Sequence, residues 1–297
     1  MSEQAVGESL LRQTSPSNSI QSLLSKANQQ LLSASETPML DAEVLLCHCL
    51  DKNRSFLRAW PEHQPSGQEL TRFTSLIDQR SQGTPLAYLT GQREFWSRNF
   101  KVSSAVLIPR PDTELLVELC LKLLPVGQSC KIIDLGTGSG IVAITLAAER
   151  PLANVFASDL STAALDIAHY NAAQLTNGNI SFRQSNWFDS ISEDSFDLIV
   201  SNPPYIAEHD PHLSEGDLRF EPSSALISPN NGLQDIRQIA EQARLRLQDK
   251  GRLLVEHGYN QQTEVQTIFH ELGYQHVNTH ADLSGNPRVT SGIWNTP

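Results

Sequence analysis

One short run of the chain combines residue types that suit a planar amino group: Asn202-Pro203-Pro204-Tyr205. The two prolines have no N–H donors, so the backbone carbonyls beside them face no competing donor. Asn202 adds a side-chain carbonyl, and Tyr205 adds a flat apolar ring. Two acceptors and a ring predict a catalytic site that holds and aims an NH2 group. The alternative is an ordinary strand-ending turn, because Asn-Pro and Pro-Pro are common there.

A second candidate site is the glycine-rich loop Gly136-Thr137-Gly138-Ser139-Gly140, which follows an apolar run and precedes a helical pattern from Ile141. Glycine lets the backbone turn tightly near a ligand, and a helix N-terminus offers unpaired N–H groups. A dinucleotide fingerprint needs G-x-G-x-x-G, but here the third glycine comes one residue early. With Asp134 just before it, the loop is typical of S-adenosylmethionine binding.

An acidic residue follows this loop at the sequence separation that is typical of nucleotide-binding sites. Asp159 ends an apolar run 23 positions beyond Gly136. A doubly wound fold has a carboxylate near this position that accepts hydrogen bonds from ribose hydroxyls. We therefore predict that Asp159 binds ribose. The alternative is a solvated strand end or the N-cap of the next helix.

Strands and helices alternate in the region that carries both motifs, which predicts a parallel sheet covered on both faces. The predicted strands are 131–135, 154–159, 196–201 and 251–256, and the predicted helices are 113–124, with Asp112 as N-cap, 141–150, 162–175 and 233–247. Residues 274–281 and 289–294 are predicted to close the sheet, as is usual in a methyltransferase. Ligands of such sheets bind beyond the carboxyl ends of the strands, so both motifs should face one crevice.

A different pattern precedes this α/β region. Residues 1–18 are polar and are expected to form a disordered tail. Helical spacing begins at Ile20, Thr37 and the capping box Ser66-x-x-Glu69 begin two further helices, and Gly83 ends the last. We predict a helical domain over 19–93, a hairpin linker over 94–111 and a doubly wound α/β methyltransferase domain over 112–297.

Composition argues against several classes of function. The 297 residues carry 33 acids and 22 bases, a net charge of −11, so a broad basic surface for nucleic acid is absent. No apolar stretch approaches the ~20 residues that cross a bilayer, and the N-terminus lacks the features of a secretory signal. Neither the four cysteines nor His209-x-x-His212 has metal-site spacing, so no metal is predicted. We expect a cytoplasmic protein.

The order and spacing of several motifs carry a family resemblance. They are Gly83–Tyr88, Gly91, Glu94–Trp96, Ile108–Glu114, Asp134–Gly140, Asn202–Tyr205, Phe220–Pro222, Glu256–Gly258, Asp282–Gly285 and Arg288-Val289. From about residue 20 the chain resembles the protein-(glutamine-N5) methyltransferases that modify the Gly-Gly-Gln loop of peptide chain release factors. The resemblance implies methyl transfer from S-adenosyl-L-methionine to the glutamine amide nitrogen of a release factor. We expect the enzyme to be a monomer.

The resemblance also implies roles for single residues. The cofactor-binding residues would be Gly136, Thr137, Gly138, Ser139, Gly140, Asp159, Asn186, Trp187 and Asn202, while Asn202, Pro203, Pro204 and Tyr205 would hold the glutamine amide. The family commonly has Asp where this chain has Asn186, whose oxygen can still accept from an adenine amino group. Trp187 would lie against the adenine or belong to the core. The helical domain would help to bind the release factor.

Two other activities use a similar acceptor. Methylation of an adenine amino group in DNA or RNA uses the same tetrapeptide, but it requires basic clusters to hold a polyanion. Methylation of a glutamine in a ribosomal protein is the other alternative. The runs 109–114 and 282–289 resemble the release-factor enzymes instead.

Overall fold

The computed structural model describes residues 18–296, so the tail predicted for residues 1–18 lies outside the described residues except for Asn18. The described chain divides into two compact units between Thr90 and Gly91. Each unit has its own apolar core, one cluster in the first unit and two in the second. Each unit therefore buries the apolar surface that stabilises it.

The first unit is helical. It contains α1 (Ile20–Leu31), α2 (Pro38–Leu50), α3 (Arg54–Ala59), α4 (Gly67–Ser81) and α5 (Leu86–Thr90). Both hydrogen bonds of the predicted capping box are present at the start of α4, between Ser66 and Glu69. Thr37 precedes α2 but does not cap it, because its hydroxyl donates to Asp41 instead. The short helices α3 and α5 were not predicted, since each is too short to show a helical period.

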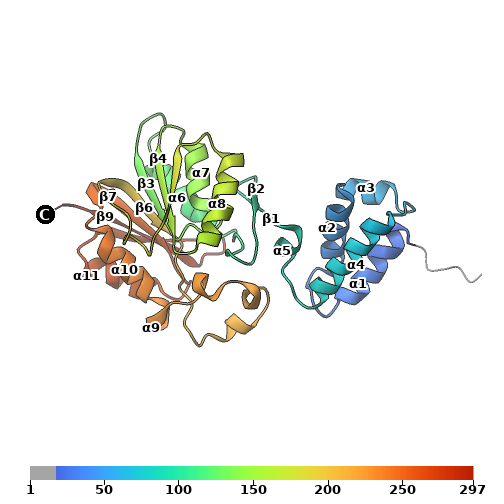
Figure 1. Cartoon of the computed structure of the whole chain (residues 1–297). Coiled ribbons are helices and arrows are strands. Elements are labelled where there is room, and N and C mark those ends of the chain that lie inside the picture. Colours follow the sequence, from blue (N-terminus) through green and yellow to red (C-terminus); the bar gives the residue numbers. More distant parts are fainter. Residues whose placement is uncertain (1–17, 297) are drawn as a thin grey trace, which may run out of the picture. The chain divides into compact units, whose positions relative to one another are not determined.

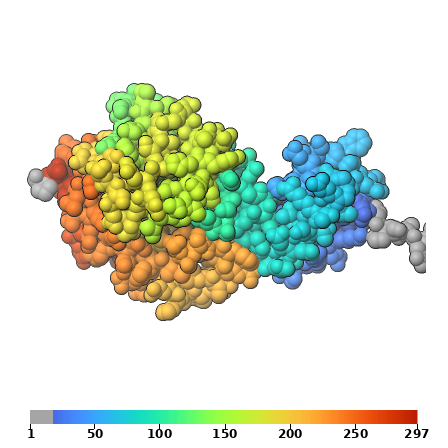
Figure 2. All heavy atoms as spheres, in the orientation of Figure 1, coloured from blue at the N-terminus to red at the C-terminus, as the bar shows by residue number. Residues whose placement is uncertain are grey.

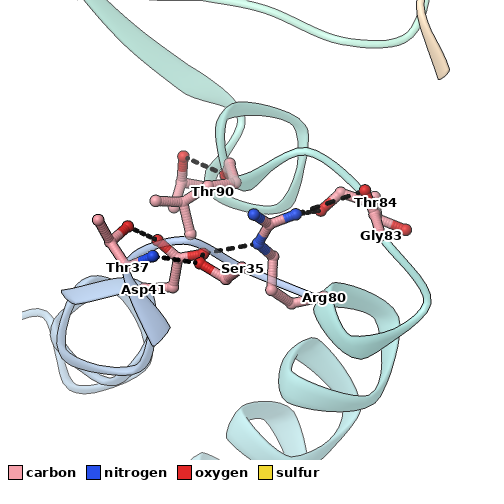
Figure 3. Close-up of polar contacts among 8 residues, drawn as sticks. Ser35, Thr37, Asp41, Arg80, Gly83, Thr84 and Thr90 are labelled. Atoms are coloured by element: carbon pink, nitrogen blue, oxygen red, sulfur yellow. Dashed lines mark hydrogen bonds and ion pairs between the residues drawn. The ribbon is translucent and has the colours of Figure 1, made fainter. Parts of the chain in front are cut away.

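A buried ion pair ties together the helices of the first unit (Figure 3). Asp41 on α2 accepts hydrogen bonds from Ser35 and Thr37 and from Arg80 Nε of α4, the last at 2.7 Å. Arg80 also donates to the carbonyl of Thr84 at 3.2 Å, beyond the end of its own helix. The pair thereby fixes the turn at Gly83, where φ is +97° and the backbone favours glycine.

The second unit begins with a hairpin of β1 (Gln92–Phe95) and β2 (Arg98–Lys101) and is built on a seven-stranded sheet in the order β5-β4-β3-β6-β7-β9-β8. The strands of this sheet are β3 (Lys131–Leu135), β4 (Asn154–Asp159), β5 (Ile180–Gln184), β6 (Phe196–Ser201), β7 (Leu247–Glu256), β8 (Gln275–Ala281) and β9 (Pro287–Trp294). Strands β3 to β7 pair in parallel, and β9 runs antiparallel to both β7 and β8. The predicted α/β sheet and its closing pair of strands are confirmed.

Helices cover both faces of this sheet (Figure 1). One face carries α6 (Thr113–Leu123), α7 (Ile141–Glu149) and α8 (Thr162–Leu175), and the other carries α10 (Gln234–Ala243) and α11 (Gln262–Glu271). Successive strand residues point to opposite faces, so Ile132 packs with the first set and Ile133 with the second. Between β6 and α10 lie η1 (Pro211–Ser214), η2 (Leu218–Phe220), η3 (Ser223–Ala225) and α9 (Pro229–Gly232).

The structure differs from the predicted elements at one helix end, one missed strand and one helix cap. The predicted helix 233–247 ends at Ala243, because Leu245 is exposed and the buried Leu247 already belongs to β7. Strand β5 was missed because it is partly exposed and includes Ser, Arg and Gln. Asp112 occupies the N-cap position of α6, as predicted, but its side chain makes no capping hydrogen bond and pairs with Arg288 at 2.9 Å instead.

Candidate active site

A cavity of about 380 Å³ lies at the carboxyl ends of four neighbouring parallel strands. Its floor is supplied by residues 136–139 after β3, 159–161 at the end of β4, 185–187 after β5, and Asn202 with Pro204 after β6. Open parallel sheets bind ligands at this edge. The structure therefore brings the glycine loop and the tetrapeptide to one cavity.

The three glycines of the loop have different surroundings, although φ is positive at all of them, +71°, +57° and +87° in order. A Cβ atom on Gly136 would lie 3.2 Å from Trp187, and one on Gly140 would lie 2.5 Å from the end of Ile144. A Cβ atom on Gly138 would meet nothing within 4 Å. Gly138 thus leaves free space at the cavity wall, whereas Gly140 does not line the cavity and lets the loop pack against α7.

Two acids hold the loop in place. Asp159 accepts hydrogen bonds from the N–H groups of Gly138 at 2.8 Å and Ser161 at 2.9 Å, and burial raises the pKa of its carboxyl. Asp159 is not the N-cap of α8, since Ser161 takes that role. Asp134 accepts from Thr137 at 2.7 Å, and burial raises its pKa to about 7. Both acids line the cavity.

Asn186 and Trp187 form the cavity wall after β5. The amide nitrogen of Asn186 donates to Asp189 at 3.1 Å, which leaves the amide oxygen as the group that can accept. The Trp187 ring lies against Gly136 and also packs on the core cluster beneath α10 and α11. Trp187 therefore lines the cavity and is also partly buried against the core.

Within the tetrapeptide, Asn202 and Pro204 line the cavity and Pro203 and Tyr205 do not. The amide nitrogen of Asn202 donates to Thr113 Oγ1 at 3.2 Å. The carbonyl of Tyr205 accepts from Gln261 at 3.0 Å, and its hydroxyl donates to Glu256 at 3.4 Å. Side chains from other elements, Thr113, Glu256 and Gln261, thus hold the tetrapeptide in place by hydrogen bonds.

Two segments that line the cavity were not predicted as part of the site. Residues 105–107, 109 and 110 line it together with 222, 224, 225 and 227. Glu221 joins these two segments, because it is buried, accepts from the N–H of Ile108 at 3.0 Å and forms an ion pair with Arg110. The motifs that contain Arg110 and Glu221 contribute to the family resemblance, but the sequence does not predict that they touch. Residues 111 positions apart give no local signal of contact.

The surface segment 207–220 that follows the tetrapeptide contains no buried residue and contributes to the orange surface in Figure 2. His212 within it bonds to Asp210 at 2.6 Å. Among residues 18–296, no three His, Cys, Asp or Glu side chains lie close enough together to hold a metal ion. The same residues include no helix with the length and apolar character needed to cross a membrane.

This sheet, with its glycine loop after β3 and its acid at the end of β4 around one cavity, defines an S-adenosylmethionine-dependent methyltransferase. The model of the methyltransferase small domain matches residues 111–220. A methyltransferase structure from Pyrococcus furiosus superposes with a TM-score of 0.52 at 16% identity, covering 78% of this chain and 100% of that one. At this identity the likeness concerns the fold alone.

The model of the PrmC N-terminal domain matches residues 22–91. Over 279 residues the chain is 49% identical to the release factor glutamine methyltransferase of Aliivibrio fischeri, covering 93% of this chain and 98% of the relative. The enzyme of the same name from Escherichia coli is 47% identical over 261 residues, covering 88% and 94%. The chain belongs to the release factor glutamine methyltransferase family, which confirms the resemblance found in the sequence.

Proposed function

We propose that this enzyme transfers a methyl group from S-adenosyl-L-methionine to the side-chain amide nitrogen of the glutamine in the Gly-Gly-Gln loop of peptide chain release factors. The observation that carries the proposal is the position of Asn202, which lines the same cavity as the glycine loop and has its amide nitrogen held by Thr113. The remaining amide oxygen is an acceptor for an NH2 group. Family membership identifies the class of molecule that bears this group.

The cavity fits the cofactor. Free space at Gly138 leaves room for a ligand against the loop, and Asp159 lies beside it as an acceptor for ribose hydroxyls. Asn186 and Trp187 provide an amide acceptor and an aromatic face for the adenine. The bound cofactor supplies an electrophilic methyl group on a sulfonium.

The protein's part in the reaction is orientation of the acceptor. An amide nitrogen is a poor nucleophile because its lone pair is delocalised into the carbonyl. A hydrogen bond from one of its protons to the Asn202 amide oxygen would draw the nitrogen toward tetrahedral geometry and aim its lone pair. Correct placement of two reactants is worth a large effective molarity. A strong base before attack is unnecessary, because the proton becomes acidic once the methyl group has transferred.

The partner in this proposal is a protein. Methylation of adenine in nucleic acid would require a basic surface, whereas this chain carries a net charge of −11. The helical first unit, matched by the PrmC N-terminal domain, is proposed to contact the release factor. We propose that the enzyme acts as a monomer in the cytoplasm and makes no direct contact with nucleic acid.

The test is a transfer assay with methyl-labelled S-adenosylmethionine and a release factor purified in unmethylated form. Mass spectrometry should place one methyl group on the glutamine of the Gly-Gly-Gln loop. A release factor with that glutamine replaced by asparagine serves as the control and should remain unlabelled. Label on DNA, RNA or a ribosomal protein, with none on the release factor, would overturn the proposal.

A further inference from the structure

A buried carboxyl lies behind the tetrapeptide and takes no part in the mechanism above. Glu256 is the last residue of β7, is 1% exposed and pairs with Val289 of β9 in the sheet. Its Oε2 atom has no hydrogen-bond partner among residues 18–296. A buried carboxyl oxygen without a partner is costly to stability. The position therefore calls for an explanation beyond packing.

The carboxyl lies close to groups at both ends of the tetrapeptide. Tyr205 donates its hydroxyl proton to Glu256 Oε1 at 3.4 Å. The Thr113 side chain also faces this carboxyl and helps to lower its pKa. Thr113 in turn accepts from the amide nitrogen of Asn202 at 3.2 Å. The Glu256 carboxyl thus contacts Tyr205 directly, and Thr113 lies between the carboxyl and Asn202.

The direction of these hydrogen bonds is not arbitrary. A carboxylate only accepts, and a threonine hydroxyl has a single proton to donate. When Thr113 gives this proton to ionised Glu256, its lone pairs are left to accept from the nitrogen of Asn202. The amide oxygen of Asn202 then faces away from Thr113. With the carboxyl protonated, Thr113 is free to donate to the Asn202 oxygen, and the amide loses its preferred orientation.

We propose that Glu256 is a positioning residue, which sets the orientation of the Asn202 amide through the Thr113 hydroxyl and so presents the acceptor oxygen of Asn202 to the substrate amide. This inference rests on the proposed function of the site. Tyr205 is fixed by the same carboxyl.

The charge state of Glu256 changes near neutral pH. Burial raises its pKa to about 7, and the charged groups that face it are Arg288 on β9, which lowers the pKa, and Asp112 before α6, which raises it. Tyr205 keeps its proton, because burial raises its pKa also. His257 follows Glu256, and burial lowers its pKa. Below pH 7 the carboxyl gains a proton, so the rate of methyl transfer at saturating S-adenosylmethionine should fall.

The decisive variant is Glu256→Gln, which keeps the shape but can both donate and accept. We expect kcat to fall roughly 10- to 100-fold, the usual cost of a misplaced group. The KM for the release factor and the Kd for S-adenosylmethionine should stay within about twofold of the parent values. The decline of kcat below pH 7, measured at saturating S-adenosylmethionine, should become clearly shallower than in the parent, with only the part due to Asp134 remaining. Glu149→Gln, which changes a carboxyl paired with Arg98 at the end of α7, is the matched control and should leave kcat unchanged.

Variants of Thr113 test the proposed route. Thr113→Val should lose as much kcat as Glu256→Gln, and the double variant should lose no more than either single one, because both remove one connection. Thr113→Ser keeps the hydroxyl and should retain most of the rate. Multiplicative losses in the double variant, or a parental rate and pH profile for Glu256→Gln, would contradict the proposal.

A spectroscopic readout separates this inference from the proposed function. In protein labelled with 13C at the tyrosine Cζ atoms, the Tyr205 signal should shift with a midpoint near pH 7 in the parent and stay constant in Glu256→Gln. A parent that fails to methylate the release factor but shows this shift would leave the Glu256 connection in place and overturn the proposed function. An active parent without the shift would overturn the connection alone.

Discussion

Gly138 and Gly178 share a left-handed backbone and open space around the position of a Cβ atom, but only Gly138 lines the cavity. An alanine in this conformation costs roughly 1–2 kcal/mol. Gly138→Ala and Gly178→Ala should therefore lower the free energy of unfolding by similar amounts in urea titrations. Only Gly138→Ala should also weaken the binding of S-adenosylmethionine in calorimetry. Equal cofactor affinities for the two variants would mean that the ligand does not approach Gly138.

Asp159 lies at the cavity with two hydrogen bonds from backbone N–H groups. Asp159→Ala removes the predicted ribose acceptor and also loosens the loop at Gly138. We expect cofactor binding to weaken by roughly 1.5–3 kcal/mol, the usual value for hydrogen bonds to a charged group. Calorimetry measures this directly, and an unchanged affinity would remove Asp159 from the cofactor site.

Two substitutions of Asn202 separate acceptor from charge. Asn202→Ala removes one positioning acceptor, and we expect a loss of ~10²-fold in turnover, by analogy with loss of an oxyanion-hole donor. Asn202→Asp keeps an acceptor but adds a negative charge near the sulfonium, which favours the cationic ground state over the transition state. It should bind cofactor as well as the parent yet react more slowly. Single-turnover rates equal to the parent for both variants would reduce Asn202 to a turn residue.

Local sequence predicted those side chains whose chemistry can be recognised from adjacent residues. The glycine loop and Asn202 belong to this group, and the structure places them on one cavity. The local sequence does not reveal the contacts of Glu221 or Glu256, because their partners come from other elements far away in the chain. Gly140, Pro203 and Tyr205 were predicted to contact ligand but do not line the cavity. Adjacent positions in a tight loop point in different directions, which spacing alone cannot resolve.

The buried side-chain amide of Asn171 connects helix α8 to the glycine loop. The Asn171 nitrogen donates to the carbonyls of Lys101 and Ser139, and its oxygen accepts from the N–H of Lys101 at 2.8 Å. Asn171→Asp would place a carboxylate oxygen against two carbonyls, so we expect a loss of roughly 3 kcal/mol or more of stability. Cofactor affinity should fall too, because Ser139 lines the cavity.

The matched control is Asn179, whose amide nitrogen donates to the carbonyls of Ala147, Arg150 and Ala153 outside the cavity. Asn179→Asp should also destabilise the fold in thermal melts. Its cofactor affinity, measured where the protein is folded, should equal that of the parent. A similar loss of affinity in both variants would show that Asn171 acts through general stability.

Elements with a clear pattern of apolar residues were predicted well, and elements whose side chains are partly exposed were not. Strands β3, β4 and β6 are buried runs, and their predicted bounds agree with the structure. Strand β5 forms one edge of the sheet, so alternating polar residues conceal it. The end of α10 was missed because Leu245 and Leu247 continue the apolar period although only Leu247 is buried. Burial, which decides such boundaries, depends on the whole fold.

For the molecule as a whole, buried carboxyls couple stability to pH. Burial raises the pKa of both Asp134 and Glu256 to about 7, so between pH ~4.5 and ~7 the folded state holds more protons than the unfolded state. Their contribution to stability therefore declines as pH rises through this window. His257 acts in the opposite sense, because burial lowers its pKa and stability is lost as pH falls.

A comparison of two proteins isolates the contribution of Glu256. The free energy of unfolding of Glu256→Gln and of the parent is measured in urea at pH 5, 6, 7 and 8. The difference, variant minus parent, should increase as pH rises, on the order of 1–3 kcal/mol across the range. The histidine contribution cancels in the difference. Parallel stability curves would show that Glu256 titrates near its ordinary pKa.

Strand β9 is the last strand in the sequence, yet it lies between β7 and β8 in the sheet. During synthesis, the N-terminus emerges first, so one edge of β7 stays without a partner until residues 287–294 have been added. Strand β9 also carries Arg288, which forms an ion pair with Asp112 before α6. Premature termination before residues 287–294 therefore leaves an open strand edge on β7 that invites aggregation.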